Sequence, residues 1–420
     1  MGWLGLDDTD SLEGGCTTEV LHQLIRQLPP NVVVGQARLV RLWPFAKRRT
    51  RGNAAVAVEL TTEDESELID WLDNHWNNNI LPLEGKVHSS THNEREQHPS
   101  DPGMVWFSKP ITNQSLYHRG LTQEITLDEL PIANASWGGH GRIGATLAVH
   151  WPAETVTYEA IAWRKKENSG LRKLDENAIK EIDQMDDSFL CRDSRLGTSL
   201  LAPKGESPVL FGVRTWTKKG AYQALEILGD AEHTEPISGG IVFATNQGTN
   251  DHLNGQFEVE VEAIEILKGG HTLIKSSTYT FLAFKQSGQI SMISQMLQPG
   301  DTIQCKGLRA QDESIHIEFL RVVHLSPKKT RPLCPTCAKS MTSMGACQGI
   351  RCKKCGYQTE DTWDYVDRQI PVNQWIQPPS SSRRPGSKLA RTLAPRSPQF
   401  VLCVSGNVCL LYTSPSPRDA

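Results

Sequence analysis

Two pairs of cysteines near the C-terminal end constrain the fold of this chain more than any other feature. Cys334 and Cys337 form one Cys-x2-Cys pair, Cys352 and Cys355 form another, and fourteen residues separate the two pairs. Four thiolates at this spacing can surround one Zn2+ ion tetrahedrally, whereas a redox dithiol needs only a single pair beside a βαβ unit. The residues between the pairs are short, polar or glycine, and would hardly form a core without a metal. The spacing predicts a zinc ribbon over residues 327–372, with these cysteines as the zinc ligands.

The length and composition are typical of a multidomain globular protein. A chain of 420 residues is expected to form about two to four domains. The hydrophobic fraction of 38% and the charged fraction of 22% exclude a collagen-like or wholly disordered chain. No apolar run approaches the roughly 18 residues of a transmembrane helix, and the first residues lack the features of a secretory signal. We therefore predict a cytoplasmic protein with no membrane partner.

The net charge of −4 conceals an asymmetry along the chain. Residues 326–396 carry thirteen Lys and Arg against four Asp and Glu, which leaves the rest of the chain at −13. An acidic body with a basic C-terminal region often binds a polyanion through that region. A basic loop that is merely solvated is the alternative explanation of the charge pattern.

Residues 1–236 predict two mixed α/β portions. In the first, residues 1–130, strands are expected at 3–6, 32–42 and 53–60, helices at 17–28 and 63–76, and a loop over 77–110. In the second, residues 131–236, strands are expected at 157–163 and 209–213 and helices at 177–185 and 221–228.

Residues 237–326 favour strands only. Five short alternating segments are separated by Gly or Pro, at 241–244, 256–267, 272–283, 301–307 and 315–323. Such a set suits a small barrel, of which the OB-fold is the commonest five-stranded form, and a small β-sandwich is the alternative. Residues 373–420 are predicted to be a basic, low-complexity tail. Its ending, LLYTSPSPRDA, resembles translated sequencing-adapter sequence, so we expect residues after about 397 not to be native.

Three carboxylates follow the first predicted strand. Asp7, Asp8 and Asp10 precede a glycine pair and a helix that begins near Thr17 and Thr18. Carboxylates at the end of a strand can hold Mg2+, which bridges nucleotide phosphates, and a helix N-terminus stabilises phosphate. The two threonine hydroxyls can cap the helix or accept a phosphoryl group. Aspartates that only cap a helix are the alternative, and a Walker P-loop is excluded because no GxxxxGK[ST] occurs.

Other candidate residues have less specific patterns. The cluster 49–53, which contains Arg51, Gly52 and Asn53, fits phosphate or RNA-backbone binding and a solvated hairpin equally well. The turn 141–144, which contains Arg142, is explained by packing as well as by binding. Glu167 lies in an ordinary loop after a predicted strand.

Several longer segments carry a family resemblance. The most specific is GLDDTDS at 5–11 with GGCTT at 14–18. The others, in order, are RLVRLWPFAKRRTRGNAAVA (38–57), DPG (101–103), GRIGATLA (141–148), TYEAIAWRKKEN (157–168), SPVLFGVR (207–214), TNQGTNDH (245–252), the cysteine pairs and SSRRPGSKLART (381–392). Together they resemble the archaeal tRNA-Ile 2-agmatinylcytidine synthetases (TiaS) over nearly the whole chain.

This resemblance implies a fold and a reaction. The implied fold class is multidomain α/β and α+β, with a kinase-like domain over 1–130, a ferredoxin-like domain over 131–236, an OB-fold over 237–326 and the zinc ribbon. The family uses ATP to attach agmatine to the wobble cytidine of the isoleucine tRNA with a CAU anticodon, so that this tRNA decodes AUA. In the mechanism proposed for the family, the cytosine 2-oxygen is phosphorylated and the primary amine of agmatine displaces the phosphate. The implied cofactors are ATP, Mg2+ and Zn2+, and the partners are this tRNA and agmatine.

The resemblance also assigns roles to residues of this chain. Handling of Mg2+ and phosphate falls to Asp7, Asp8 and Asp10, and the autophosphorylated threonine of the family to Thr18. We further expect ATP or phosphate binding at Thr17, Arg51, Gly52 and Asn53, and agmatine binding at Glu167 and Arg142. For tRNA binding we expect Lys353, Lys354, Arg383 and Arg384.

Two other functions fit parts of the sequence. A non-catalytic tRNA- or single-strand-binding protein explains the barrel and the ribbon but gives the DDTD loop no purpose. A Mg2+-dependent kinase of a small metabolite explains that loop but leaves the basic arm with only an assembly role. The chain also departs from the family pattern at 215–218 and over most of 77–110, which leaves details of the substrate pocket open.

Overall fold

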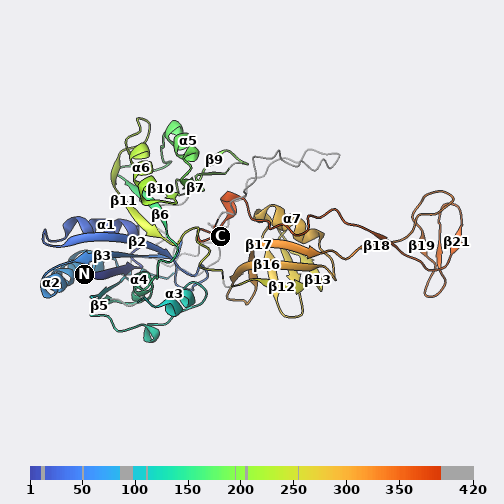
Figure 1. The fold of residues 1–420 in the computed structure, drawn as a ribbon, viewed down its shortest axis with the longest axis horizontal. Helices are drawn as coiled ribbons and strands as arrows, with labels where there is room; N and C mark the ends of the chain where they lie inside the picture. The colour runs from blue at the N-terminus through green and yellow to red at the C-terminus, as the bar shows by residue number, and fades with distance from the viewer. Residues whose placement is uncertain are drawn as a thin grey trace. The chain divides into compact units, whose positions relative to one another are not determined.

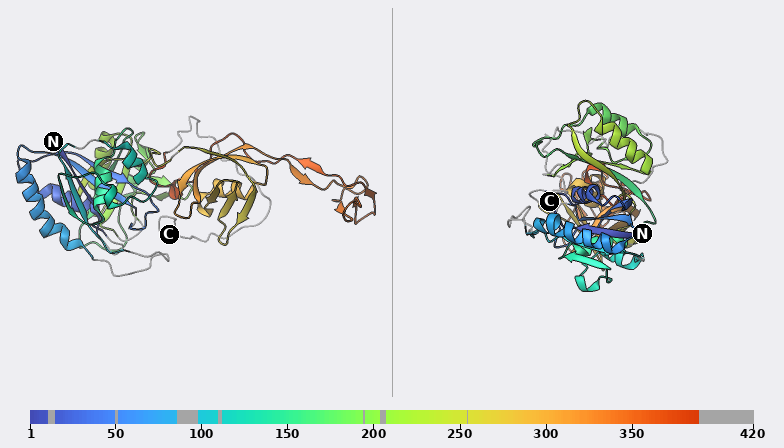
Figure 2. Two further views of the ribbon diagram at one scale, coloured as in Figure 1. Left: turned by 90° about the horizontal axis from the view of Figure 1, so that it is seen from below. Right: turned by 90° about the vertical axis from the view of Figure 1, so that its left-hand side faces the viewer.

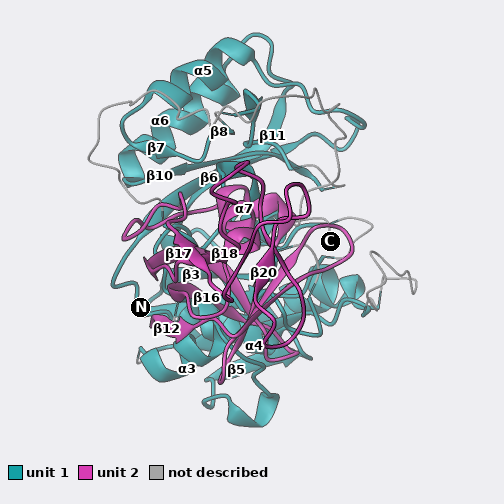
Figure 3. Cartoon of the chain, turned by 90° about the vertical axis from the view of Figure 1, so that its right-hand side faces the viewer, with its two compact units in different colours: residues 1–254, 379–420 teal, residues 255–378 magenta. Residues whose placement is uncertain are grey.

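The computed structural model describes residues 1–10, 15–49, 52–85, 98–109, 112–193, 195–203, 207–253 and 255–388. The chain forms two compact units (Figure 3). Unit 1 comprises residues 1–254 and 379–420, and unit 2 comprises residues 255–378. Unit 2 is therefore inserted into unit 1 and joined to it by two chain connections.

A nine-stranded sheet organises unit 1, in the order β5-β4-β1-β3-β2-β11-β6-β10-β7 (Figure 1). Its strands are β1 (Gly2–Asp7), β2 (Val33–Arg41), β3 (Ala54–Thr61), β4 (Gly103–Phe107), β5 (Ala135–Gly138), β6 (Thr157–Arg164), β7 (Ser188–Phe189), β10 (Val209–Thr215) and β11 (Ile237–Thr245). The strands β2 and β11 pair in parallel, and all other neighbours in this sheet are antiparallel. Through the β2–β11 pair, the strands β1–β5 form one sheet with β6, β7 and β10.

The strand predicted at 241–244 was grouped with the barrel strands, and this grouping is wrong. The segment is part of β11, which pairs with β6 from Ile237 to Thr245 and lies in unit 1. Its short apolar pattern is the same as that of a barrel strand, and only the distant partners β2 and β6 distinguish the two cases.

Helices cover both faces of the sheet (Figures 1 and 2). They are α1 (Thr17–Gln27), α2 (Glu65–His75), α3 (Gln114–Gly120), α4 (Arg142–Val149), α5 (Glu176–Gln184) and α6 (Lys218–Gly229). Side chains alternate along a strand, so Leu4 and Leu6 of β1 pack with α1 and α2, whereas Trp3 packs with α3 and α4. The helices α5 and α6 bury their apolar faces against β6 and β10. A small two-stranded sheet, β8 (Arg192–Asp193) with β9 (Thr198–Ser199), completes unit 1.

The loop predicted over 77–110 contains regular structure. The helix α2 continues into a π-helical turn, Trp76–Ile80, and a 3-10 turn, Leu81–Leu83. The fully buried strand β4 then occupies Gly103–Phe107, between β1 and β5. The prediction gave too much weight to the polar residues before β4, although the apolar run MVWF is a buried-strand signal.

Unit 2 contains a six-stranded sheet and one helix of its own. The sheet has the order β12-β16-β17-β15-β14-β13. Its elements are β12 (Phe257–Glu260), β13 (Ala263–Ile266), β14 (Thr272–Lys275), β15 (Thr280–Ala283), α7 (Gln289–Met296), β16 (Thr302–Arg309) and β17 (Ile315–His324). The predicted strands 256–267 and 272–283 are each divided in two. The helix α7 was not predicted, although Ile290, Ile293 and Leu297 follow helical spacing and are buried in the core of unit 2.

The ribbon at the end of unit 2 consists of very short strands. The strand β18 (Lys328–Thr330) pairs with β22 (Asp364–Val366), and β19 (Thr342–Ser343), β20 (Ile350–Arg351) and β21 (Gln358–Thr359) form a three-stranded sheet. The ribbon's core is little more than Met341, Ile350 and cysteine side chains. No helix in the described ranges is long and apolar enough to span a membrane.

Candidate carboxylate pocket and four-cysteine centre

The predicted carboxylates line a pocket at the C-terminal end of β1. The pocket is bordered by Asp7, Asp8, Asp10, Leu42, Trp43, Ala46, Arg48, Arg49, Asn53, Ala54, Gly120, Gln123, Glu124, Ile125, His140, Ile143, Gly144 and Leu147. These residues come from four separate stretches of the sequence, so the sheet and α4 assemble the pocket. Four acidic and two arginine side chains thus border the same space.

Glycines allow the helix α4 to approach the carboxylates closely. A Cβ atom on Gly144 would lie 1.8 Å from Oδ2 of Asp7, and one on Gly141 would lie 2.5 Å from the Asp7 carbonyl oxygen. On the neighbouring strand β4, a Cβ atom on Gly103 would lie 1.9 Å from the backbone nitrogen of Arg142. The packing interpretation of the 141–144 turn is therefore correct for its glycines, and this packing places Asp7 beside the first turn of α4.

Burial makes the first two carboxylates costly to ionise. It raises the pKa of Asp7 well above its ordinary value, and the neighbouring charges of Asp8 and Asp10 add to the effect. Burial likewise raises the pKa of Asp8 to about 7, although the backbone amide of Asp101 and the charge of Arg48 act in the opposite direction. A cation near these carboxylates would reduce their repulsion and replace part of the lost solvation.

Asp101, the first residue of the DPG segment, also contacts the carboxylates and was not predicted as a site residue. The backbone nitrogen of Asp101 donates to Oδ2 of Asp8 (3.2 Å), and its side chain forms an ion pair with Arg48 (3.5 Å). Asp8 has a left-handed backbone (φ 58°), which an Asp residue tolerates better than most. The DPG segment thus holds Asp8 in place, and only the pairing of β1 with β4 reveals this contact.

The two threonines have different surroundings. Thr17 Oγ1 accepts from Thr9 Oγ1 (3.1 Å) and donates to Oδ1 of Asp10 (3.4 Å), which ties it to the carboxylates. Thr18 Oγ1 accepts from Trp163 Nε1 (3.3 Å) and lies 2.8 Å from Cys16 Sγ. Cys16 is the N-cap of α1 and makes no capping bond through its side chain, so neither threonine caps this helix.

Of the other predicted phosphate ligands, Asn53 alone is found at the pocket within the described ranges. Asn53 borders the pocket and donates from Nδ2 to the Trp43 carbonyl (2.6 Å). Gly52 lies beside Arg41, where a Cβ atom would be 2.5 Å from Nη1. Arg51 lies outside the described residues.

The two predicted agmatine ligands do not form a pair. Arg142 starts α4, and its Nε donates to the Gly139 carbonyl (3.2 Å). Glu167 is exposed in the loop after β6, and no ion pair joins it to Arg142 within the described ranges. The adjacent Lys166 faces Glu19 of α1, and its charge opposes the rise that burial causes in the pKa of Glu19.

A buried ionic network in the middle of the sheet was also missed. Glu159 of β6 is 3% exposed, and it contacts Arg41 of β2 (3.7 Å) and Arg214 of β10 (3.4 Å). Gln247 donates to Glu159 and accepts from Arg214 Nε (3.0 Å). The sequence signal for this network was Glu159 itself, a charged residue within an apolar strand, because buried charged residues are almost always paired.

The four cysteines converge as the spacing predicts. The Sγ distances are 3.4 Å for Cys334 to Cys355, 3.4 Å for Cys337 to Cys352 and 3.7 Å for Cys337 to Cys355. Tetrahedral Zn–S bonds place sulfur atoms about 3.8 Å apart. Within the described ranges, these cysteines form the one group of three or more metal-ligating side chains that comes together, and the carboxylates of the pocket do not converge in this way.

The predicted tRNA-binding residues fall in different units. Lys353 and Lys354 are exposed between Cys352 and Cys355 in unit 2. Arg383 and Arg384 belong to unit 1, where the Arg384 guanidinium lies 4.7 Å from the centre of the Phe45 ring.

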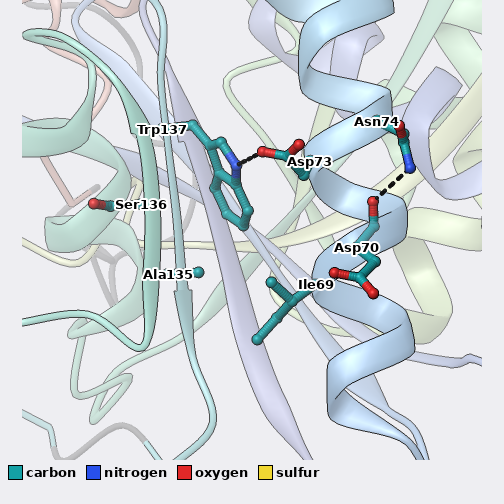
Figure 4. A pocket seen from close by; sticks show the side chains of 7 residues that line it. All are labelled: Ile69, Asp70, Asp73, Asn74, Ala135, Ser136 and Trp137. Atoms are coloured by element: carbon teal, nitrogen blue, oxygen red, sulfur yellow. Dashed lines mark hydrogen bonds between the residues drawn. The ribbon is translucent and has the colours of Figure 1, made fainter.

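A second hollow lies between α2 and β5 (Figure 4). It is bordered by Ile69, Asp70, Asp73, Asn74, Ala135, Ser136 and Trp137, and Trp137 Nε1 donates to Oδ1 of Asp73 (3.0 Å). None of the predicted site residues borders it.

Comparisons with known proteins agree across nearly the whole chain. Three family models match: the TiaS TCKD domain over residues 3–136, the TiaS FLD domain over 139–252 and the TiaS C-terminal zinc ribbon domain over 331–370. The 2-agmatinylcytidine synthetase TiaS of Ignisphaera aggregans, which is named for its isoleucine tRNA, is 30% identical over 430 residues, covering 90% of each chain. That of Archaeoglobus fulgidus is 28% identical over 432 residues, covering 93% of this chain and 97% of the relative. A crystal structure of TiaS in complex with this isoleucine tRNA and ATP matches with a TM-score of 0.77 at 25% identity, covering 95% of this chain and 99% of that chain.

The fold and the two sites define a multidomain α/β protein that combines a carboxylate pocket with a zinc ribbon. The chain belongs to the TiaS family, the 2-agmatinylcytidine synthetases of isoleucine tRNA. The family prediction is thereby confirmed.

Proposed function

We propose that the chain is an ATP-dependent ligase that attaches agmatine to the 2-position of the wobble cytidine in the CAU-anticodon isoleucine tRNA. The observation that carries the proposal is the match to synthetases of this name over about nine-tenths of both chains. The likeness to a solved complex with the isoleucine tRNA and ATP supports the same substrates. Such a reaction belongs in the cytoplasm, where tRNA is modified and used.

The carboxylate pocket supports the phosphoryl-transfer half of the reaction. We assign Mg2+ binding to Asp7 and Asp8, because carboxylate oxygens are the ligands that a hard divalent cation prefers and both side chains border the pocket. Bound there, Mg2+ would supply charge neutralisation for the phosphates of ATP. Arg48 and Arg49 border the same pocket and add positive charge for the phosphates. Thr17 holds Asp10 in place by a hydrogen bond, and Thr18 keeps its assignment as the phosphorylated threonine.

The chemistry requires activation before the amine attacks. Phosphorylation of the cytosine 2-oxygen by ATP forms an O–P bond while a phosphoanhydride bond of ATP breaks, and it converts a poor leaving group into one that departs as phosphate. The primary amine of agmatine then bonds to C2, the C2–O bond breaks, and the amine loses a proton. We assign the guanidinium of agmatine to a carboxylate, with Glu167 as the candidate. Arg142, the first residue of α4, stays a proposed residue of the agmatine site.

Unit 2 supports the binding of tRNA. We assign Lys353 and Lys354, which are exposed on the ribbon, to contacts with the tRNA backbone. The six-stranded sheet of unit 2 fits an OB-fold-like barrel, and the halves of unit 1 fit a kinase-like and a ferredoxin-like domain. The cysteine centre would hold Zn2+ and fold the ribbon, because the ribbon has almost no other core.

The test is incorporation of labelled agmatine into defined tRNA transcripts. Protein, ATP, Mg2+ and labelled agmatine are incubated with the CAU-anticodon isoleucine tRNA, and in parallel with the same transcript carrying a GAU anticodon. We expect label in the first transcript only, and only with ATP. Binding of both transcripts without label in either would support a tRNA-binding protein instead, and ATP turnover that ignores tRNA and agmatine would support a metabolite kinase.

A further inference from the structure

The residues that follow unit 2 fold back onto unit 1. We call residues 379–388 the strap. Its backbone bonds to the loop 245–252: Gly248 N donates to the Pro385 carbonyl (2.8 Å), Asn250 N donates to the Gly386 carbonyl (2.9 Å), and Lys388 N donates to Oδ1 of Asn250 (2.6 Å). The strap is therefore an integral part of unit 1 and differs from the structureless tail predicted over 373–420.

The loop 245–252 depends on these bonds. Most of its residues are buried, and buried backbone donors that lack a partner are costly. The strap supplies the acceptors for Gly248 and Asn250 from a distant part of the sequence. The approach is so close that a Cβ atom on Gly386 would lie 2.6 Å from Nδ1 of His252.

The loop in turn fixes the end of β2, from which the chain enters the carboxylate pocket. The Asn246 side chain accepts from Arg41 N (2.8 Å) and donates to the Arg41 carbonyl (2.9 Å). Leu42 and Trp43, the next two residues, both border the pocket. A continuous set of contacts thus runs from the strap, through the loop, to the pocket wall.

Arg384 provides a second and more direct connection. Its guanidinium lies over the Phe45 ring (4.7 Å), and Phe45 packs edge-on against Trp43 (5.9 Å between centroids). Trp43 borders the pocket and accepts a hydrogen bond from Asn53. At its other end the strap is anchored where Ser381 N donates to Oδ2 of the buried Asp193 (3.3 Å).

We propose that the strap positions the carboxylate pocket, and that Arg384 is a positioning residue for residues 43–49 of its wall. Arg384 acts through Phe45 and Trp43, and it makes no contribution to tRNA affinity of its own. The proposal rests on the proposed function in one respect, namely that the carboxylate pocket binds Mg2+ and ATP. It replaces the expected role of Arg384 as a contact to the tRNA backbone.

The first test is a double-mutant cycle on the full-length protein. The variants are Arg384→Ala, Arg384→Lys, Phe45→Leu and the double variant Arg384→Ala/Phe45→Leu, with Lys353→Ala as the matched cation control in unit 2. Mg2+-ATP affinity and tRNA affinity are measured separately. We expect each of the Ala and Leu variants to weaken Mg2+-ATP binding by about three- to tenfold, the size of a partly desolvated cation–π contact. The double variant should be no worse than either single one, the Lys variant should recover most of the loss, and tRNA affinity should stay unchanged.

The control variant should show the opposite pattern. Lys353→Ala is expected to weaken tRNA binding and leave Mg2+-ATP binding unchanged. If Arg384→Ala instead weakens tRNA binding and leaves Mg2+-ATP affinity unchanged, Arg384 is a tRNA contact and the proposal is overturned. Additive effects of Arg384→Ala and Phe45→Leu would also overturn it.

A second test does not need ATP or tRNA. Gly386→Ala adds a Cβ atom toward His252 and should release the strap, whereas Ser382→Ala is the control within the strap. Amide hydrogen exchange should accelerate over 246–252 and 43–49 in Gly386→Ala alone. Acceleration confined to the strap would contradict the proposal. If this test succeeds while the parent protein makes no modified tRNA, the proposed function fails and the strap's structural role stands.

Discussion

Asp8 is a residue whose conformation and charge cost stability, although the proposed reaction needs its carboxylate. Its left-handed backbone and its half-buried carboxylate are both costly, and the partial loss of solvent raises the pKa of the carboxylate to about 7. Asp8→Asn should abolish agmatine transfer and keep tRNA affinity, because the amide cannot neutralise a cation. Asn tolerates the same backbone conformation, and above pH 7 the change removes a partly desolvated charge, so the variant should unfold at a temperature no lower than the parent's. Product formation, tRNA affinity and thermal unfolding check this prediction, and retained product formation would show that Asp8 is not a catalytic residue.

Gly144 tests whether the position of Asp7 matters independently of its chemistry. In Gly144→Ala the new Cβ atom would lie 1.8 Å from Oδ2 of Asp7, so the carboxylate must move. Alanine favours a helix over glycine by about 1 kcal/mol, which offsets part of the clash. We expect activity to fall by at least about 100-fold while the free energy of unfolding changes by no more than about 2 kcal/mol.

The matched control for this variant is Gly229→Ala at the end of α6. Its Cβ atom would lie 3.4 Å from Cδ1 of Ile237, an ordinary contact. Kinetics and denaturant unfolding on both variants separate displacement of the carboxylate from a general effect of alanine. Equal activity in both would mean that Asp7 need not occupy its present position.

At the residue scale, motifs with fixed spacing were predicted and contacts between distant segments were not. The spacing of the cysteines was enough to predict their cluster, whereas the carboxylates were selected by a local pattern together with the family resemblance. Asp101, Arg48 and Glu159 act through strands that are distant in the sequence, and their partners follow only from the register of the sheet. Arg384 was selected for its charge alone, and the sequence could not show that its guanidinium lies over the Phe45 ring of unit 1.

Of the structural elements, the zinc ribbon is the one whose folding depends most on a bound metal. Its core consists of Met341, Ile350 and cysteine side chains, and its strands are two or three residues long. Cys352→Ser should lose bound Zn2+, unfold the ribbon and weaken tRNA binding by about tenfold or more at moderate salt, with Mg2+-ATP binding in unit 1 unchanged. The free Cys347, which is exposed and outside the cluster, provides the control Cys347→Ser. Zinc content by atomic absorption and tRNA affinity test the expectation, and full tRNA affinity without zinc would contradict it.

Helices with a clear periodic spacing of apolar residues were predicted correctly. A strand whose place depends on its pairing partners was assigned to the wrong sheet. The helices near 17–28, 63–76, 177–185 and 221–228 were found close to their predicted bounds, because their apolar spacing is unambiguous. The strand β11 was grouped with the wrong set of strands, since its pattern carries no information on pairing with β2 and β6. The helix α7 was missed because the surrounding strands outweighed its short helical spacing.

In the whole molecule, unit 2 is an insertion into unit 1. The segments of unit 1 that precede and follow unit 2 are hydrogen-bonded to each other. Asn250 precedes unit 2 and Lys388 follows it, and a hydrogen bond of 2.6 Å joins them. Replacing residues 255–378 by a flexible linker of about fifteen residues, which can span up to about 50 Å, should leave unit 1 folded. This shortened protein is expected to bind Mg2+-ATP and to lose tRNA binding. Calorimetry and filter binding measure both properties, and a shortened protein that fails to fold would contradict the division into two units.

Mass spectrometry of nucleosides from the modified tRNA tests whether the protein attaches agmatine to the wobble cytidine. The CAU-anticodon isoleucine tRNA transcript is incubated with the protein, ATP, Mg2+ and agmatine, and a parallel reaction omits agmatine. We expect a cytidine that is heavier by the mass of agmatine minus water, in the complete reaction only. An unmodified cytidine in both reactions, from a protein that binds the tRNA and contains zinc, would contradict the proposed transfer of agmatine.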